Sequence, residues 1–347
     1  MNGLLQNGFP PPPPGRTGWP WTEECEAPSD ATGLSKITIV TASFNQGAFI
    51  EETIRSVVLQ NYPNLEYIII DGGSTDETVS VIRKYERYLT AWISEKDKGQ
   101  SDAINKGIRR ATGDIFNWLN SDDLLAKDAL RTVAGLLQDE TKDVACCRVH
   151  NFGERDVITE PSSCFSVKKD QALKPNINQP GTFFRMNVIR GLGPLEQELH
   201  YCMDLEWWIR YLLRHDIDRV VVSDEVVARF REHDTSKTGS QSLRFITDKL
   251  NLFSAILAKK EALFRPLGDY RFPDDLSHVP LAFLQKLFSA TFYDSAVIAY
   301  GKREMARVRE LLSYVDREAL PESLRVNFDR MKFRARFFPR FLFHLKG

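Results

Sequence analysis

The fold of this chain of 347 residues is decided by two stretches, ITIVTASFNQG at residues 37–47 and EYIIIDGGSTD at residues 66–76. Each stretch opens with a β-branched apolar run, as buried strands do, and ends in small polar residues that turn the chain. Between them, Ile50, Ile54 and Val57 recur at the spacing of one helix face. The sequence therefore predicts a strand, a helix and a second strand in this region.

The same alternation continues along the chain, with helices predicted at 77–88, 101–111 and 127–138, and strands at 91–94 and 115–119. Strands that alternate with helices form a parallel sheet with right-handed crossovers, which indicates an α/β fold. Ligands of such sheets bind beyond the carboxyl ends of the strands. Three sites in the sequence lie at such ends: Asn45, Asp71 and the pair Asp122–Asp123.

The chain on either side of this region has other patterns. Residues 1–34 contain the run Pro10–Pro14 and no apolar periodicity, so we expect a disordered, proline-rich arm. Residues 141–240 are predicted to hold antiparallel strands at 144–152 and 157–159, two further strands at 220–222 and 226–230, a strand ending at Arg185, and a helix at 203–213. Residues 241–347 are predicted to be helical, at 243–261, 281–300, 303–315 and from 324 onwards.

Composition excludes several classes of protein. With 46 Lys and Arg against 47 Asp and Glu, the chain has no general attraction to nucleic acid. Its five cysteines show no CxxC spacing, which argues against a disulfide framework or a zinc site. No secretory signal is visible, and the most apolar window, 281–300, contains charged residues that disfavour a membrane span. We expect a soluble, cytoplasmic protein.

The adjacent acids Asp122 and Asp123 are the first candidate site. Neighbouring carboxylates repel each other unless a cation or a donor neutralises them, and Mg²⁺ typically binds one or two carboxylates together with substrate phosphates. The sequence Ser-Asp-Asp before a helix also serves as a helix cap. The residues alone leave both readings open.

Four further candidates accompany this pair. Asp71 can accept a hydrogen bond from a base or a ribose, or it can simply form the turn before Gly72–Gly73. The loop 98–102 offers polar groups ahead of a helix. Asp204 lies beside aromatic residues, where a partly desolvated carboxylate becomes basic enough to remove a proton, although an exposed helix acid is an alternative. Arg231 and His233, after a strand, suit a diphosphate or a metal, and a structural role is the alternative for the histidine.

Together these segments resemble the family 2 glycosyltransferases, which have the GT-A fold. The resemblance covers about residues 36–238 and is carried by four stretches: ITIVTASFNQGAFIEETIRSVVLQNYPNLEYIIIDGGSTDET, DKGQSDAINKGIRRATGDIFNWLNSDD, CMDLEWWIR and FREHDTSKT. It implies a Rossmann-like, mostly parallel sheet flanked by helices at 35–240, with a helical C-terminal extension at 241–347. Within that domain, 35–140 would bind the nucleotide and 141–240 the acceptor.

The resemblance also implies a role for each candidate. The nucleotide-binding residues would be Thr41, Ser43, Asn45, Asp71, Gln100, Asp102 and Asp122. Asp123, Asp122 and His233 would hold Mn²⁺ or Mg²⁺, with Asn120 at the position where many members have the first aspartate. Asp204 would be the general base, preceded by Met203 instead of the usual acid.

The implied reaction is the metal-dependent, inverting transfer of one sugar from a nucleotide-sugar, in the first place a UDP-sugar. The acceptor would be a hydroxyl of a glycan or a lipid-linked molecule, in polysaccharide or glycoconjugate synthesis. The QxxRW motif of processive members is absent, which favours single transfer. Two alternatives stay open: a non-catalytic binding subunit on a GT-A scaffold, and a sugar-nucleotide pyrophosphorylase, although the latter's glycine-rich phosphate loop is missing.

The C-terminal segment 330–347 is rich in Arg, Lys and Phe and has no acidic residue. A basic, aromatic segment can lie on an anionic membrane surface, and it can also dock on its own domain or on a partner. The sequence therefore allows peripheral contact with the inner face of a membrane and leaves the oligomeric state open.

Overall fold

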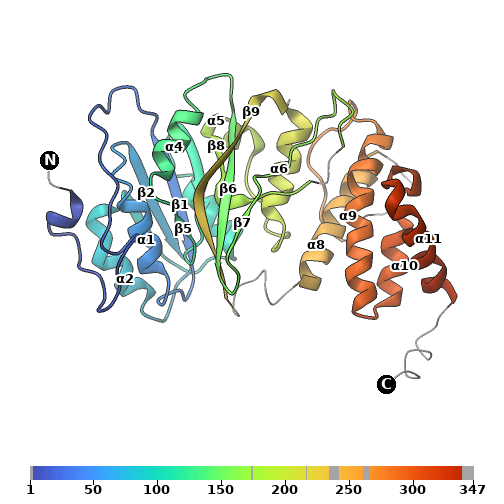
Figure 1. Ribbon diagram of the computed structural model, residues 1–347, viewed down its shortest axis with the longest axis horizontal. Helices are drawn as coiled ribbons and strands as arrows, with labels where there is room; N and C mark the ends of the chain where they lie inside the picture. Colours follow the sequence, from blue (N-terminus) through green and yellow to red (C-terminus); the bar gives the residue numbers. More distant parts are fainter. Residues whose placement is uncertain are drawn as a thin grey trace. The chain divides into compact units, whose positions relative to one another are not determined.

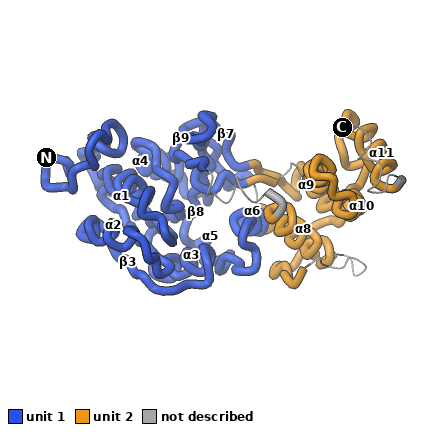
Figure 2. Tube along the Cα trace, turned by 90° about the horizontal axis from the view of Figure 1, so that it is seen from below, with its two compact units in different colours: residues 1–162, 177–211, 217–240 blue, residues 163–176, 212–216, 241–347 orange. Residues whose placement is uncertain are grey.

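The computed structural model describes residues 3–172, 175–215, 217–233, 242–260, 266 and 268–337. The chain divides into two compact units (Figure 2). The first comprises residues 1–162, 177–211 and 217–240, and the second residues 163–176, 212–216 and 241–347. The main segment of the second unit thus begins where the sequence pattern becomes helical.

A mixed sheet forms the centre of the first unit, with the strand order β3-β2-β1-β4-β8-β6-β9-β5 and β7 paired to β6 (Figure 1). The strands are β1 (Ile37–Ser43), β2 (Leu65–Asp71), β3 (Ala91–Ser94), β4 (Ile115–Trp118), β5 (Leu124–Leu125), β6 (Val144–Gly153), β7 (Val157–Thr159), β8 (Thr182–Arg185) and β9 (Val220–Glu232). The helices are α1 (Ile50–Val58), α2 (Thr78–Tyr85), α3 (Gln100–Ile108), α4 (Ala129–Leu136), α5 (Met186–Leu192) and α6 (Met203–Arg214).

The first four strands are parallel, as the alternating sequence pattern predicts. Their register sets Ser43 opposite Asp71, and Asp71 opposite Ser94, so the polar ends of three strands meet at one edge. Strands β2 and β3 lie on one side of β1 and β4 lies on the other, which makes the junction of β1 and β4 a topological switch point. Open α/β sheets bind ligands at the carboxyl ends beside such a point.

The second half of the sheet departs from the sequence prediction in detail. The strands expected at 220–222 and 226–230 are one strand, β9, because its pairing with β6 shifts register near Arg148 instead of breaking. Strand β5 and helix α5 were not predicted. Two residues are too few to show the alternation that identifies a strand, and β5 exists only through its pairing with β9.

The N-terminal arm, which the sequence predicts to be disordered, has specific contacts with the rest of the first unit within residues 3–34. The guanidinium of Arg55, which is fully buried, donates to the carbonyl oxygens of Pro10 at 2.7 Å, Pro20 at 3.0 Å and Trp21 at 2.6 Å. It also lies 4.9 Å from the ring centroid of Phe9 and 5.3 Å from that of Trp21. An arginine far along the chain thus orders the arm, which the local composition cannot reveal.

Glu66 joins three segments at the amino end of the sheet. It is 3% exposed, and its carboxylate accepts hydrogen bonds from Lys36 Nζ at 2.8 Å, Thr38 Oγ1 at 2.6 Å and Thr112 N at 2.7 Å. Burial alone raises the pKa of a carboxyl, but the donors from Lys36, Thr112 and Thr38 outweigh it and lower the pKa of Glu66 to about 2.

The second unit is a bundle of helices with an aromatic interior, which confirms the predicted helical C-terminal region (Figure 1). Its helices are α8 (Ser242–Ala258), α9 (Leu281–Gly301), α10 (Met305–Ser313) and α11 (Glu322–Phe337). The rings of Phe253 and Phe288 stack with centroids 4.2 Å apart, and those of Phe292 and Tyr314 stack at 5.1 Å. Among the described residues, no helix is both long enough and apolar enough to cross a bilayer.

The low pKa of Glu66 predicts an acid-sensitive contribution to stability. Because its pKa lies below the ordinary 4.5, the contribution is fully present above that pH and is lost as the pH falls towards about 2. We expect Glu66→Gln to lower the free energy of unfolding by about 2 kcal/mol at pH 7. Urea unfolding measured from pH 7 to pH 3 should show this difference shrinking. The exposed control Glu140→Gln should change little, and a difference for Glu66→Gln that is constant with pH would contradict the assignment.

Candidate active site

The site lies at the carboxyl edge of β1, β2 and β4. Ser43 ends β1 and its hydroxyl oxygen is buried without a hydrogen-bond partner among the described residues. Such an atom costs free energy unless a ligand or water completes it. Thr41, two residues earlier, is fully buried, and its hydroxyl lies 3.1 Å from the hydroxyl of Tyr67. The structure therefore places Ser43 at the edge and Thr41 beneath it.

Asp71 is built into the turn that follows β2. Its carboxylate accepts hydrogen bonds from Gly73 N at 3.1 Å, Ser74 N at 2.9 Å, Ser74 Oγ at 2.5 Å and Ser94 Oγ at 2.5 Å. Gly73 has a φ of 84°, a conformation that favours glycine. The turn-forming role that the sequence left open is thus present, and a nucleotide base could reach this carboxylate only in competition with its serine donors.

Asn45 connects the first two strand-end loops. Its side-chain oxygen accepts from Thr75 N at 2.9 Å, and its own N–H donates to Ser74 Oγ at 2.7 Å. Phe44, just before it, is 59% exposed at the same edge and was missed in the sequence. The sequence did contain a signal for Phe44. Side chains alternate along a strand, so Phe44 points to the side opposite the buried Ser43. An exposed aromatic ring is a surface on which a nucleotide base can stack.

The two adjacent acids after β4 have different environments. Asp123 is fully buried, with Oδ1 accepting from Arg231 N at 2.9 Å and Oδ2 from Asn120 Nδ2 at 3.0 Å. Burial, and after it the charge of Asp122, raises the pKa of Asp123 well above its usual range. The side chain of Asp122 is 21% exposed, and its Oδ2 lies 3.0 Å from Nε2 of His233.

The pair formed by Asp122 and His233 suits a divalent cation. The His233 side chain is 17% exposed, and its ring centroid lies 4.8 Å from that of Phe49. No group of three metal-ligating side chains occurs within the described ranges, but a cation that also binds a diphosphate needs only one or two protein ligands. Asp123 was expected to share this role, but protein donors already occupy both of its oxygens.

Arg231, on β9, holds in place the turn at residues 120–123, which we call the acidic turn. Besides its backbone bond to Asp123, its Nε donates to the carbonyl oxygen of Asp122 at 3.0 Å, and its Nη2 donates to Glu52 Oε2 on α1 at 2.8 Å. The guanidinium lies 5.2 Å from the ring centroid of Phe49 and 4.5 Å from that of Phe152. Arg231 thereby joins β9, the acidic turn and α1, and its side chain binds protein groups.

A chain of contacts extends this edge to α3 and α6. Gln100 Nε2 donates to Asn120 Oδ1 at 2.7 Å, and Ser101 Oγ donates to the sulfur of Met203 at 3.1 Å. A small pocket lies here, lined by Lys98, Gly99, Gln100, Ser101, Gln197, His200 and Met203. Asp204, the candidate base, follows Met203 in the first turn of α6 and is not among the residues that line this pocket.

The remaining candidate, Asp102, lies on α3. Its carboxylate accepts from Lys98 N at 3.2 Å and lies 3.6 Å from Lys106 Nζ, one helical turn away. These bonds close the loop that precedes α3. Asp102 therefore shapes the loop between β3 and α3, and Gln100 connects α3 to Asn120 in the acidic turn.

The fold and this site define a class of protein, a nucleotide-sugar-dependent transferase with a GT-A domain. A sequence profile of glycosyl transferase family 2 matches residues 38–195. An uncharacterized glycosyltransferase of Mycobacterium tuberculosis is 29% identical over 217 residues, which cover 60% of this chain and 79% of the relative. Residues 38–195 therefore match a glycosyl transferase family 2 domain, and the chain is a glycosyltransferase.

Two solved structures share the fold. Residues 1–349 of Staphylococcus aureus TarS, in complex with UDP-GlcNAc, superpose with a TM-score of 0.62 at 16% identity, covering 86% of this chain and 89% of that one. A mannosyltransferase of Pyrobaculum calidifontis, in complex with GDP-Man and Mn²⁺, gives a TM-score of 0.50 at 17% identity, covering 91% of each chain. The match to the family model sets aside the alternative of a pyrophosphorylase.

The contacts of Arg231 predict coupling between two elements of the site. We expect Arg231→Met to lower the free energy of unfolding by about 2–3 kcal/mol, because it leaves Glu52 without its partner in a partly buried place. A double-mutant cycle with Glu52→Gln, measured by urea unfolding, should give a coupling of about 1 kcal/mol or more. The exposed pair Lys127–Glu23 is the control, for which we expect at most about 0.5 kcal/mol. Equal coupling in the two cycles would refute the role given to Arg231.

Proposed function

We propose that this glycosyltransferase transfers one sugar, with inversion, from a nucleoside-diphosphate sugar to a hydroxyl group of a glycan or lipid-linked acceptor. The observation that carries the proposal is the partly exposed pair Asp122–His233 beside the junction of β1 and β4. A UDP-sugar is the first candidate donor, since TarS, whose fold is similar, is described in complex with UDP-GlcNAc.

The nucleotide would lie along the ends of β1 and β2. Ser43 offers a buried hydroxyl without a protein partner, and Gln46 a side-chain oxygen in the same state, so both have hydrogen-bonding capacity for a ligand. Phe44 supplies an exposed ring against which a base can stack. In this proposal Asp71, Asn45 and Asp102 contribute by fixing the loops that form the walls of the site.

Asp122 and His233 would hold the divalent cation. A bound cation of this kind neutralises the charge that develops on the leaving diphosphate. A histidine ligand favours Mn²⁺ over Mg²⁺, because Mg²⁺ prefers oxygen ligands alone. Asp123 would act indirectly, by fixing the turn that carries Asp122.

Asp204 would act as the general base in the transfer step. A hydroxyl group is a weak nucleophile, and a carboxylate that accepts its proton during attack makes it stronger. The acceptor oxygen forms the new bond at the anomeric carbon as the bond to the diphosphate breaks, and attack from the opposite side inverts that carbon. Trp207 and Trp208 on the same helix are fully buried, and their packing holds α6 in position.

Donor turnover tests the proposal. The chain is incubated with UDP-GlcNAc, other UDP-sugars and GDP-mannose, with Mn²⁺, Mg²⁺ or EDTA, and release of the nucleoside diphosphate is measured. We expect slow release from one donor, abolished by EDTA. Asp122→Asn and His233→Ala should each raise the Mn²⁺ concentration needed for half-maximal rate at least tenfold. Unchanged Mn²⁺ dependence in both variants would contradict the assignment of Asp122 and His233 as metal ligands. Failure of the chain to bind any nucleoside diphosphate would contradict the proposed function.

Two variants separate donor binding from transfer, and each is the control for the other. With an acceptor that supports turnover, Asp204→Asn should lower kcat by about 10²–10⁴-fold and leave the KM for the donor unchanged. Phe44→Ala should raise that KM by about tenfold and leave kcat nearly unchanged. A wild-type kcat in Asp204→Asn would show that another group is the base.

A further inference from the structure

Helix α11 presents an outward face that combines apolar and cationic side chains. Val326 is 55% exposed and Phe333 is 59% exposed, and Arg330 is exposed between them. The spacing of these three residues, four and then three positions, places them on one side of the helix. The opposite side carries the buried residues Phe328 and Ala335, which pack into the bundle.

More cations flank this outward face. Lys332, Arg334 and Arg336 are all exposed, and none of the ion pairs within the described residues involves Arg330, Lys332 or Arg334. The exposed face of α11 therefore carries uncompensated positive charge next to an exposed phenylalanine.

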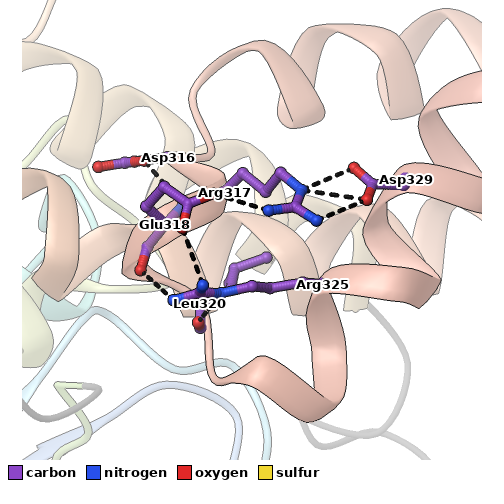
Figure 3. A network of polar contacts seen from close by, with 6 residues as sticks. All are labelled: Asp316, Arg317, Glu318, Leu320, Arg325 and Asp329. Atoms are coloured by element: carbon purple, nitrogen blue, oxygen red, sulfur yellow. Dashed lines mark hydrogen bonds and ion pairs between the residues drawn. The ribbon is translucent and has the colours of Figure 1, made fainter.

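Two acids on or beside this helix, Asp329 and Glu318, are paired, and the exposed Glu322 lies in the first turn, about three turns before Phe333. Figure 3 shows Arg317 binding Asp329 on α11, with Nη2 at 2.9 Å from Oδ2, and Arg325 binding Glu318, with Nη1 at 2.8 Å from Oε2. The Nη1 of Arg317 also lies 2.6 Å from Glu318 Oε1. Because Arg317 and Arg325 neutralise these two carboxylates, Asp329 and Glu318 do not offset the charges of Arg330 and Arg334.

The same contacts hold the helix rigidly. Arg325 also donates to the carbonyl oxygens of Leu320 at 3.0 Å and Glu318 at 2.7 Å, and Arg309 on α10 donates to the carbonyl oxygen of Ala335 at 2.9 Å. Both ends of α11 are thus tied to its own bundle. A fixed helix presents its outward side chains together, without the cost of ordering them on binding.

We propose that the face formed by Val326, Arg330, Phe333 and Arg334, the outer face of α11, binds the surface of an anionic lipid bilayer. Cations near such a surface are attracted by its negative potential, and exposed aromatic rings enter the boundary between headgroups and acyl chains. The charge complementarity favours lipid over a second copy of this chain, since two such faces would repel each other. The proposal is independent of the donor site. Of the segment 330–347 that the sequence singled out, residues 338–347 lie outside the described residues.

Vesicle sedimentation with the full chain tests this. We expect binding to phosphatidylcholine vesicles that contain one third phosphatidylglycerol, weak binding to phosphatidylcholine alone, and loss of binding between 50 mM and 500 mM salt. The double variant Arg330→Gln with Arg334→Gln should bind about thirtyfold more weakly, at about 1 kcal/mol for each cation. The matched control, Arg109→Gln with Lys168→Gln, removes two exposed cations elsewhere and should bind as the wild type does.

A second variant separates the apolar contribution. Phe333→Ser should weaken binding and leave its salt dependence unchanged, since the cations remain. The proposal is overturned if the chain binds neither kind of vesicle or binds both kinds equally. It is also overturned if the double variant of Arg330 and Arg334 binds as tightly as the control double variant of Arg109 and Lys168. It is also overturned if light scattering shows a dimer that Phe333→Ser dissociates, because a second copy would then cover this face.

Discussion

The candidate site depends on one residue, Arg231, and on the three elements that it joins. Its backbone fixes Asp123, and its guanidinium binds the carbonyl of Asp122 and the carboxylate of Glu52 on α1. The sheet brings β9 to this place through pairing with β6 and β5, more than a hundred residues from the acidic turn in sequence. His233 follows two residues after Arg231, so the bonds that anchor the arginine also set the distance between His233 and Asp122.

This arrangement resolves the repulsion between two adjacent acids by giving each a different environment. Asp123 is buried and accepts two protein donors, and its raised pKa is the consequence of that burial together with the charge of Asp122. Asp122 turns towards the edge and meets a histidine. The buried acid fixes the turn, and this leaves the partly exposed acid available for the cation that we propose.

Arginines recur as connectors between segments of this protein. Arg55 binds three carbonyl oxygens of the N-terminal arm, and Arg317 with Arg325 fixes the start of α11. A guanidinium has five donors in a planar fork, so one side chain can satisfy acceptors from several segments at once. In the arm this supplies the order that its proline-rich composition does not provide, and on α11 it removes the negative charge that would oppose an anionic partner.

The sequence by itself determined the parallel half of the sheet, the helical C-terminal unit and the family, because alternating strands and helices and short motifs are local patterns. It also located the edge where Ser43, Asp71 and Asp122 lie, since strand ends can be read from apolar runs. It could not distinguish Asp122 from Asp123, place Thr41 beneath the edge, detect Phe44 or predict an ordered arm. Those outcomes depend on burial and on partners distant in the chain, such as Arg231 for Asp123 and Arg55 for Pro10, and only tertiary packing brings these groups together.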